Sequence, residues 1–361
     1  MSEKYAGRDL YTHIRNRLRE IGRGRFSVEI KSKHPGLSGL SEVLSPTYFE
    51  SCVSCTLVVA GYNAVENKFK VPSLAKRIGE CLQKCAVIAS KVTIISRDDS
   101  RKKDVADVIE LMNVDWSMRV SWKALIQLKE GKYNNGSQLP DKDDVRKVVE
   151  YVDKNLPIHL ENLKEDPSNA VHYNSLMKLT LSSVIILNRK RPGDTHRLKV
   201  STYESAIQES THDDIWTSLS VEEKHLVTSL KRVETPGKKK HNKIPIRFTP
   251  RMQDCVAQLL QSRRSCGVPS DYPYVFANVN SSTYCRGSDA IRKLREDACC
   301  THPERVTATN LRKEAATVAK IAGLSEAQVE ELAQFLGHDI RTHLDHYRLP
   351  EATLQTARVS T

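Results

Sequence analysis

The sequence predicts a mainly helical protein with a small antiparallel β-sheet, an α+β fold divided into two domains. Apolar residues recur at helical spacing in residues 105–112 and 145–152, which is typical of helices with one buried face. Between residues 231 and 248, β-branched residues flank a basic turn that begins with Pro-Gly, and this pattern indicates a two-stranded hairpin. The chain has 361 residues, which is longer than an ordinary domain with a single hydrophobic core, so we expect two domains.

Three segments are expected along the chain. Residues 1–35 are rich in arginine and lysine and are expected to form a basic N-terminal arm. Residues 36–165 read as a helical domain, whereas residues 166–361 mix helices with short strands. The boundary is placed in the polar stretch "ENLKEDPSNA", residues 161–170, where the pattern changes.

The charge of the chain indicates a polyanionic partner. Its net charge is +12 and its pI is about 9.2, which makes nucleic acid the first candidate. No run of 18 apolar residues occurs, so no membrane span is expected. The first residues are polar and charged, so no signal peptide is expected. An odd number of scattered cysteines, nine in all, then predicts reduced thiols in an intracellular protein.

Two cysteine pairs have spacings that zinc sites also use. Cys52 and Cys55 are three residues apart, and Cys81 and Cys85 are four apart. The second pair falls on one helical stripe with apolar residues at 74, 78, 82 and 88, which favours buried free thiols. We therefore expect no metal site here, and the few tryptophans and phenylalanines argue against a base-stacking platform.

The stretch "ELAQFLGHDIRTHLDHYRLP", residues 331–350, places three histidines shortly before a tyrosine. Metal ligation, solvent exposure and a tyrosine nucleophile with a histidine helper are competing interpretations. His343 and His346 share a helix face, but no carboxylate or cysteine pattern completes a metal site. We expect these two histidines near DNA or solvent, and His338 to serve Tyr347.

The sequence "LGH" with a tyrosine nine positions after the histidine resembles the end of the catalytic domain of tyrosine recombinases, the phage-integrase-like family. "LNRKRPGDTHRLKV" resembles the helix end that carries the family's first arginine, followed three residues later by an acid. The matching positions are Arg191 and Asp194. These residues are expected to be catalytic and supporting, respectively.

Two further motifs follow in the family's order. "TPGKKKHNKIPI" resembles the hairpin that carries the catalytic lysine; Lys238 is the best match, and Lys239 and Lys240 remain alternatives. "TATNLRKEAA" resembles the family's His-x-x-Arg box, with Arg312 as the second arginine. Thr309 stands where the family has histidine. Residues 205–227 read as a loop and helix inserted before the hairpin.

The resemblance covers roughly residues 170–355. The residues of the motifs are most similar to those of recombinases from eukaryotic Crypton and DIRS-like mobile elements or their host-adopted descendants. It implies a two-domain clamp, in which residues 36–165 are the core-binding domain and residues 166–361 the catalytic domain. It also implies self-association as a dimer or tetramer on double-stranded DNA, and a reducing, nuclear location.

The implied activity is DNA recombination and integration through a 3′-phosphotyrosyl intermediate, without metal or cofactor. The attacking phenol has a pKa of about 10 in water, so the site must assist its ionisation. Two arginines offer bidentate forks to the phosphate oxygens, and a lysine can protonate the leaving 5′-oxygen. Because threonine cannot shuttle a proton as histidine can, Thr309 favours the alternative of a catalytically impaired DNA-binding protein. A non-enzymatic protein of another fold is a second alternative, in which Arg191, Lys238, Arg312, His338 and Tyr347 would not converge.

Overall fold

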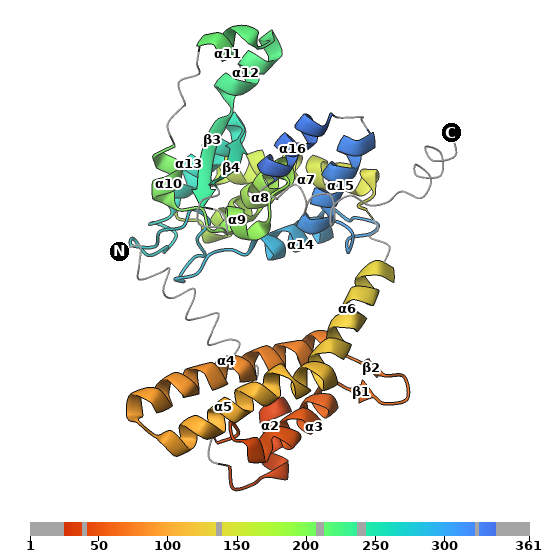
Figure 1. The fold of residues 1–361 in the computed structure, drawn as a ribbon. Helices are drawn as coiled ribbons and strands as arrows, with labels where there is room; N and C mark the ends of the chain where they lie inside the picture. Colours follow the sequence, from red (N-terminus) through yellow and green to blue (C-terminus); the bar gives the residue numbers. More distant parts are fainter. Residues whose placement is uncertain are drawn as a thin grey trace, which may run out of the picture. The chain divides into compact units, whose positions relative to one another are not determined.

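The structure is a computed structural model (Figure 1). It describes residues 25–37, 42–134, 139–206, 213–236, 243–321 and 325–336. The chain divides into two compact units, Met1–Gly136 and Ser137–Thr361. The described residues of the two units form many helices and two antiparallel sheets of two strands each, so the predicted α+β class is confirmed. In the described part of the chain, no helix is both long enough and apolar enough to cross a bilayer.

The first unit packs its helices around one core. Its elements are α2 (Arg25–Lys33), η1 (Pro46–Tyr48), α3 (Phe49–Val59), β1 (Tyr62–Asn63), β2 (Lys68–Phe69), α4 (Pro72–Ser96), α5 (Asp99–Asn113), the π-helical turn η2 (Ser117–Ser121) and α6 (Trp122–Asn134). Phe26 and Ile30 of α2 are 1% and 2% exposed. The predicted basic arm is therefore wrong for its last residues, because α2 contributes two apolar side chains to this core.

The prediction of buried free thiols at Cys81 and Cys85 is confirmed for Cys81 and holds only in part for Cys85. Cys52, Cys55 and Cys81 are buried free thiols, and Cys85 is half-buried. The expected stripe of α4 is buried at Ile78, Cys81 and Leu82 but not at its end, since Ile88 is 59% exposed. Among the described residues, no three metal-ligating side chains come together.

The second unit is built around α8, a helix buried on nearly all sides. Its elements are α7 (Lys142–Glu165), α8 (Ala170–Asn188), α9 (Pro192–His196), α10 (Val200–Glu204), α11 (Asp213–Ser218), α12 (Val221–Ser229), β3 (Lys231–Pro236), β4 (Lys243–Phe248), α13 (Pro250–Ser262), α14 (Gly287–Asp297), α15 (Ala308–Ile321) and α16 (Glu326–Phe335). Helices α7, α13 and α14 and strand β4 pack against α8. This is why every residue of α8 from Leu179 to Ile186 is buried, and why the apolar residues of this stretch are not confined to one stripe.

The boundary expected at residues 165/166 lies earlier, between Gly136 and Ser137. Helix α7 packs on α8 and α13 of the second unit and buries Val148, Val152 and Leu156. The polar stretch that suggested a linker is a tight turn between α7 and α8. The Asn169 side chain accepts hydrogen bonds from the N–H groups of residues 171 and 172, and so caps α8. The polarity of this stretch therefore reflects helix capping. The functions expected of the two domains stay predictions.

The predicted hairpin is confirmed. Strands β3 and β4 pair antiparallel, in a register that runs from Lys231 opposite Phe248 to Pro236 opposite Lys243. Val233 and Ile246, which are paired in this register, are both fully buried. Residues 237–242, between the strands, lie outside the described residues.

Candidate functional site

The candidate site is centred on the turn that follows α8. The helix ends at Asn188, and Arg189 adopts a left-handed conformation with φ of 49°, which turns the chain toward α9. The Asn188 side chain is buried and makes two 2.8 Å hydrogen bonds to the main chain of Arg247 in β4. It donates to the carbonyl and accepts from the N–H of that residue. The turn is thus fixed to the strand that follows the predicted lysine loop.

Arg312, the predicted second arginine, lies on α15 and reaches this turn. Its side chain is only 1% exposed. Its Nη1 donates to the main-chain oxygen of Arg189 at 3.2 Å, and its Nη2 donates to that of Leu336 at 3.0 Å. The guanidinium therefore joins the end of α8 to the end of α16 and is held in one orientation.

Lys190 lies beside Arg312 and is fully buried. Its Nζ donates a hydrogen bond to the main-chain oxygen of Phe335 and lies 3.8 Å from the centroid of the Phe335 ring. Burial, followed by the positive charge of Arg312, lowers the pKa of Lys190 to about 7, whereas the carboxylate of Asp194 acts in the opposite direction. We missed Lys190 in the sequence; its one signal there was its place in the basic run before Arg191.

Arg191 and Asp194 begin α9. Arg191 is the N-cap residue and is half-buried, and its carbonyl accepts the N–H of Asp194 at 2.9 Å. Asp194 is 7% exposed, and its Oδ2 has no hydrogen-bond partner among the described residues. Its negative charge favours the ammonium form of Lys190. The structure thus places the predicted acid where it acts on Lys190.

Further cations surround this turn. Arg232 and Arg247 lie opposite each other in the hairpin, and the guanidinium of Arg247 is 4.7 Å from the centroid of the Phe335 ring. Burial, followed by the charge of Arg232, lowers the pKa of Arg247. Arg189 forms an ion pair with Glu314 at 3.4 Å. We call Arg189, Lys190, Arg191, Arg232, Arg247 and Arg312 the basic cluster, and such a group of cations favours an anionic ligand.

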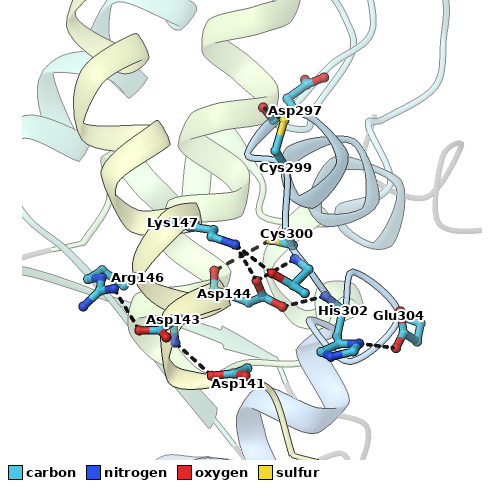
Figure 2. Close-up of polar contacts among 11 residues, drawn as sticks. Asp141, Asp143, Asp144, Arg146, Lys147, Asp297, Cys299, Cys300, His302 and Glu304 are labelled. Carbon is cyan, nitrogen blue, oxygen red and sulfur yellow. Dashed lines mark hydrogen bonds and ion pairs between the residues drawn. The ribbon is translucent and has the colours of Figure 1, made fainter.

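A second polar cluster fixes the loop that leads into α15 (Figure 2). The carboxylate of Asp144, at the start of α7, is 1% exposed and accepts the N–H groups of Thr301 and His302, both at 2.7 Å. Lys147 donates to the same carboxylate at 3.3 Å and to the Thr301 hydroxyl at 2.8 Å. Burial acts to raise the pKa of Asp144, but these hydrogen bonds outweigh it and the pKa is lowered. The loop before Thr309 and Arg312 is thereby held on α7.

The predicted site residues fall into two groups. Arg191, Asp194 and Arg312 converge on the turn after α8, while Thr309 is exposed in the first turn of α15, three residues before Arg312. Lys238, Lys239, Lys240, His338, His343, His346 and Tyr347 lie outside the described residues. The chain on either side of these is placed: β3 ends at Pro236, β4 begins at Lys243, and Leu336 directly precedes Gly337. The convergence of all five expected catalytic residues therefore stays a prediction.

The chain was compared with known proteins. No protein-family model and no curated protein matches it. One similar solved structure is that of XerA recombinase, with 13% identity, a TM-score of 0.35, and coverage of 93% of this chain and 97% of the other. Another is XerH site-specific recombinase bound to palindromic difH substrate in a post-cleavage complex, with 14% identity, a TM-score of 0.43, and coverage of 87% and 83%. At this similarity neither match establishes a family, and we infer function from the residues themselves.

Proposed function

We propose that this protein binds double-stranded DNA and acts as a site-specific recombinase or integrase that cuts and rejoins strands through Tyr347. The observation that supports this most is the basic cluster, in which Arg312 and the Lys190–Arg191 turn meet the end of α16. The next residues of the chain are Gly337 and His338, and Tyr347 follows nine positions later. The two motifs that carry Arg191 and Arg312 thus meet at the basic cluster.

The proposed reaction is a phosphoryl transfer with a covalent intermediate. The Tyr347 oxygen attacks phosphorus as its proton passes to the imidazole of His338 or to solvent, and the bond from phosphorus to the 5′-oxygen breaks. Lys238, or one of its neighbours Lys239 and Lys240, donates the proton that the leaving 5′-oxygen takes up. The phosphotyrosine keeps the energy of the broken ester, and attack by a 5′-hydroxyl reverses the steps and rejoins the strand.

The remaining residues would stabilise the charge of the transition state. Arg191 and Arg312 offer N–H groups to the non-bridging phosphate oxygens, and His338 offers a hydrogen bond from its imidazole. Two main-chain carbonyls orient the Arg312 guanidinium, and such preorganisation is what makes electrostatic stabilisation effective. Thr309 can donate a hydrogen bond to a phosphate oxygen and cannot act as a proton shuttle at neutral pH.

A binding protein without cleavage activity is the second candidate function. It is favoured by Thr309, which replaces the imidazole of the family's His-x-x-Arg box. From the residues of these motifs we further propose that the chain originates from a Crypton- or DIRS-like mobile element or is a host-adopted descendant of one. Self-association on DNA and a nuclear location belong to the same proposal.

A trapping experiment tests the function. The purified chain is incubated with a library of random-sequence duplexes, each carrying a nick so that the cleaved strand end diffuses away. We expect a covalent protein–DNA adduct that survives denaturing electrophoresis. Tyr347→Phe should abolish the adduct and leave DNA affinity nearly unchanged, since the substitution removes no charge. Tyr151→Phe on α7 is the matched control and should form the adduct as the parent does.

The outcomes separate the candidates. If the parent binds these duplexes and forms no adduct, the binding-only function is the better account. If the parent does not bind duplex DNA, both candidates are wrong. An adduct that persists in Tyr347→Phe would assign the nucleophile to another residue and refute the assigned site.

A further inference from the structure

The end of α16 is held by two cationic side chains. The last carbonyls of a helix have no partner within the helix and need other donors. Lys190 donates to the carbonyl of Phe335, and Arg312 donates to the carbonyl of Leu336 at 3.0 Å. These donors come from the turn after α8 and from α15, and they bond two consecutive carbonyls. Positive charge at this end also suits the helix dipole.

We propose that Lys190 is a positioning residue, whose ammonium group, together with Arg312, fixes the end of α16 from which the chain continues to Gly337 and His338. The catalytic consequence rests on the proposed function, because His338 and Tyr347 follow this point in the sequence. The positioning itself rests only on described residues. Lys190 is fully buried, and the proposal needs no direct contact between its side chain and DNA.

The surroundings of Lys190 are unfavourable for a positive charge, so the presence of a lysine here calls for an explanation. A buried ammonium is costly, and an apolar side chain of similar length would fill the same space at less cost. Arg312 on α15, Arg247 on β4 and Arg232 on β3 all disfavour its protonated form. Three features favour the ammonium: the Phe335 carbonyl, the face of the Phe335 ring and the carboxylate of Asp194 on α9. Two of the three belong to the last residue of α16.

Protonation of Lys190 therefore controls this contact. Only the ammonium donates to the Phe335 carbonyl with full strength, and its pKa of about 7 means that the proton is lost as the pH rises through neutrality. A phosphate bound at the basic cluster would add negative charge nearby and favour the ammonium. Binding of DNA would then tighten the end of α16 as the substrate arrives.

Amide hydrogen exchange tests the positioning without requiring activity. Exchange of peptides from residues 326–336 is measured between about pH 6 and pH 8.5 and corrected for the intrinsic effect of pH. In the parent, we expect protection of the last turn of α16 to fall roughly tenfold across this range as the charged hydrogen bond is lost. In Lys190→Met, protection should be low throughout and independent of pH. Lys178→Met, at an exposed position on α8, should behave as the parent does.

The measurement on the parent protein alone can overturn the inference. If its corrected protection does not change across this range, the ammonium does not control the end of α16, whatever the fold of the variant. If Lys190→Met shows the pH dependence of the parent, another group is responsible and Lys190 is not the positioning residue.

Single-turnover adduct formation on the nicked duplexes tests the catalytic consequence. We expect Lys190→Met to form the adduct roughly 10- to 100-fold more slowly at about pH 6.5, since small displacements in an active site have effects of this size. The loss of DNA affinity should be much smaller, because the substitution removes one buried charge. Lys178→Met should match the parent. An unchanged rate in Lys190→Met would refute the catalytic consequence. Absence of any adduct in the parent would refute the proposed activity instead, and hydrogen exchange would still decide the positioning.

Discussion

The buried carboxylate of Asp144 allows a sharp test of how the loop before α15 is held (Figure 2). The substitution Asp144→Asn keeps the size of the side chain and replaces one accepting oxygen with an NH2 group. That group then faces a main-chain N–H, either of Thr301 or of His302, each of which is now 2.7 Å from a carboxylate oxygen. One donor is left facing another donor in a site that is 1% exposed.

The expected loss follows from these contacts. A hydrogen bond to a charged acceptor contributes about 1.5–3 kcal/mol, and a buried donor left without a partner costs about 1–3 kcal/mol. The two contributions overlap, so we expect Asp144→Asn to lower the free energy of unfolding by about 3 kcal/mol. Asp143→Asn is the matched control, because Asp143 is 68% exposed and pairs with Arg146 on the surface. It should change stability by about 0.5 kcal/mol or less.

Urea unfolding of the parent and both variants measures this, and its pH dependence checks the cause. The folded-state pKa of Asp144 is lowered, so its stabilisation is complete above the unfolded pKa, near 3.8, and is lost as the pH falls through the folded pKa. The difference between the parent and Asp144→Asn should therefore shrink on strong acidification. If Asp144→Asn costs no more than Asp143→Asn at neutral pH, the carboxylate does not hold this loop.

Three further predictions concern the basic cluster and DNA. The folded pKa of Lys190 is depressed from 10.5 to about 7, so the globally unfolded chain binds more protons than the folded chain between these values. The free energy of global unfolding should therefore rise with pH by up to about 1.4 kcal/mol per unit in the parent and not in Lys190→Met, although the local hydrogen bond to the Phe335 carbonyl weakens over the same range. Parallel urea-derived curves for the two proteins would contradict this. Asn188→Ala leaves the N–H and carbonyl of Arg247 without these partners and should lower the free energy of unfolding by about 2–4 kcal/mol. Asn155→Ala, which removes one hydrogen bond within α7, is the control and should lower it by about 1 kcal/mol in the same urea assay. Equal losses would mean that Asn188 does not anchor the hairpin. Affinity for duplex DNA should fall about a thousandfold between about 50 and 200 mM salt in a fluorescence anisotropy titration, and binding that ignores salt would argue against a phosphate-contacting surface.

The sequence by itself determined the elements whose stability depends on near neighbours. Ser325 and Gln328, three residues apart in the sequence, form a capping box at the start of α16 through hydrogen bonds between them. The hairpin likewise follows from its flanking β-branched residues. The second half of α8 is likewise predictable, because a helical segment buried on all sides carries mainly apolar and small residues on all sides. The same local view misled at residues 161–170, since a capped turn between two packed helices has the composition of a linker.

Only the tertiary structure decided what the charged residues do. Lys190 contacts a carbonyl 145 positions away, Arg312 one that is 24 away, and Asp144 a main-chain N–H 157 away. Composition and spacing carry no trace of such pairs, because each partner is a main-chain group that every residue has. A buried lysine and an exposed one therefore look the same in the sequence. The motif around Arg191 and Arg312 indicated where to look, and the packing of α8, α15 and α16 decided which of the cations are buried there and what they bond.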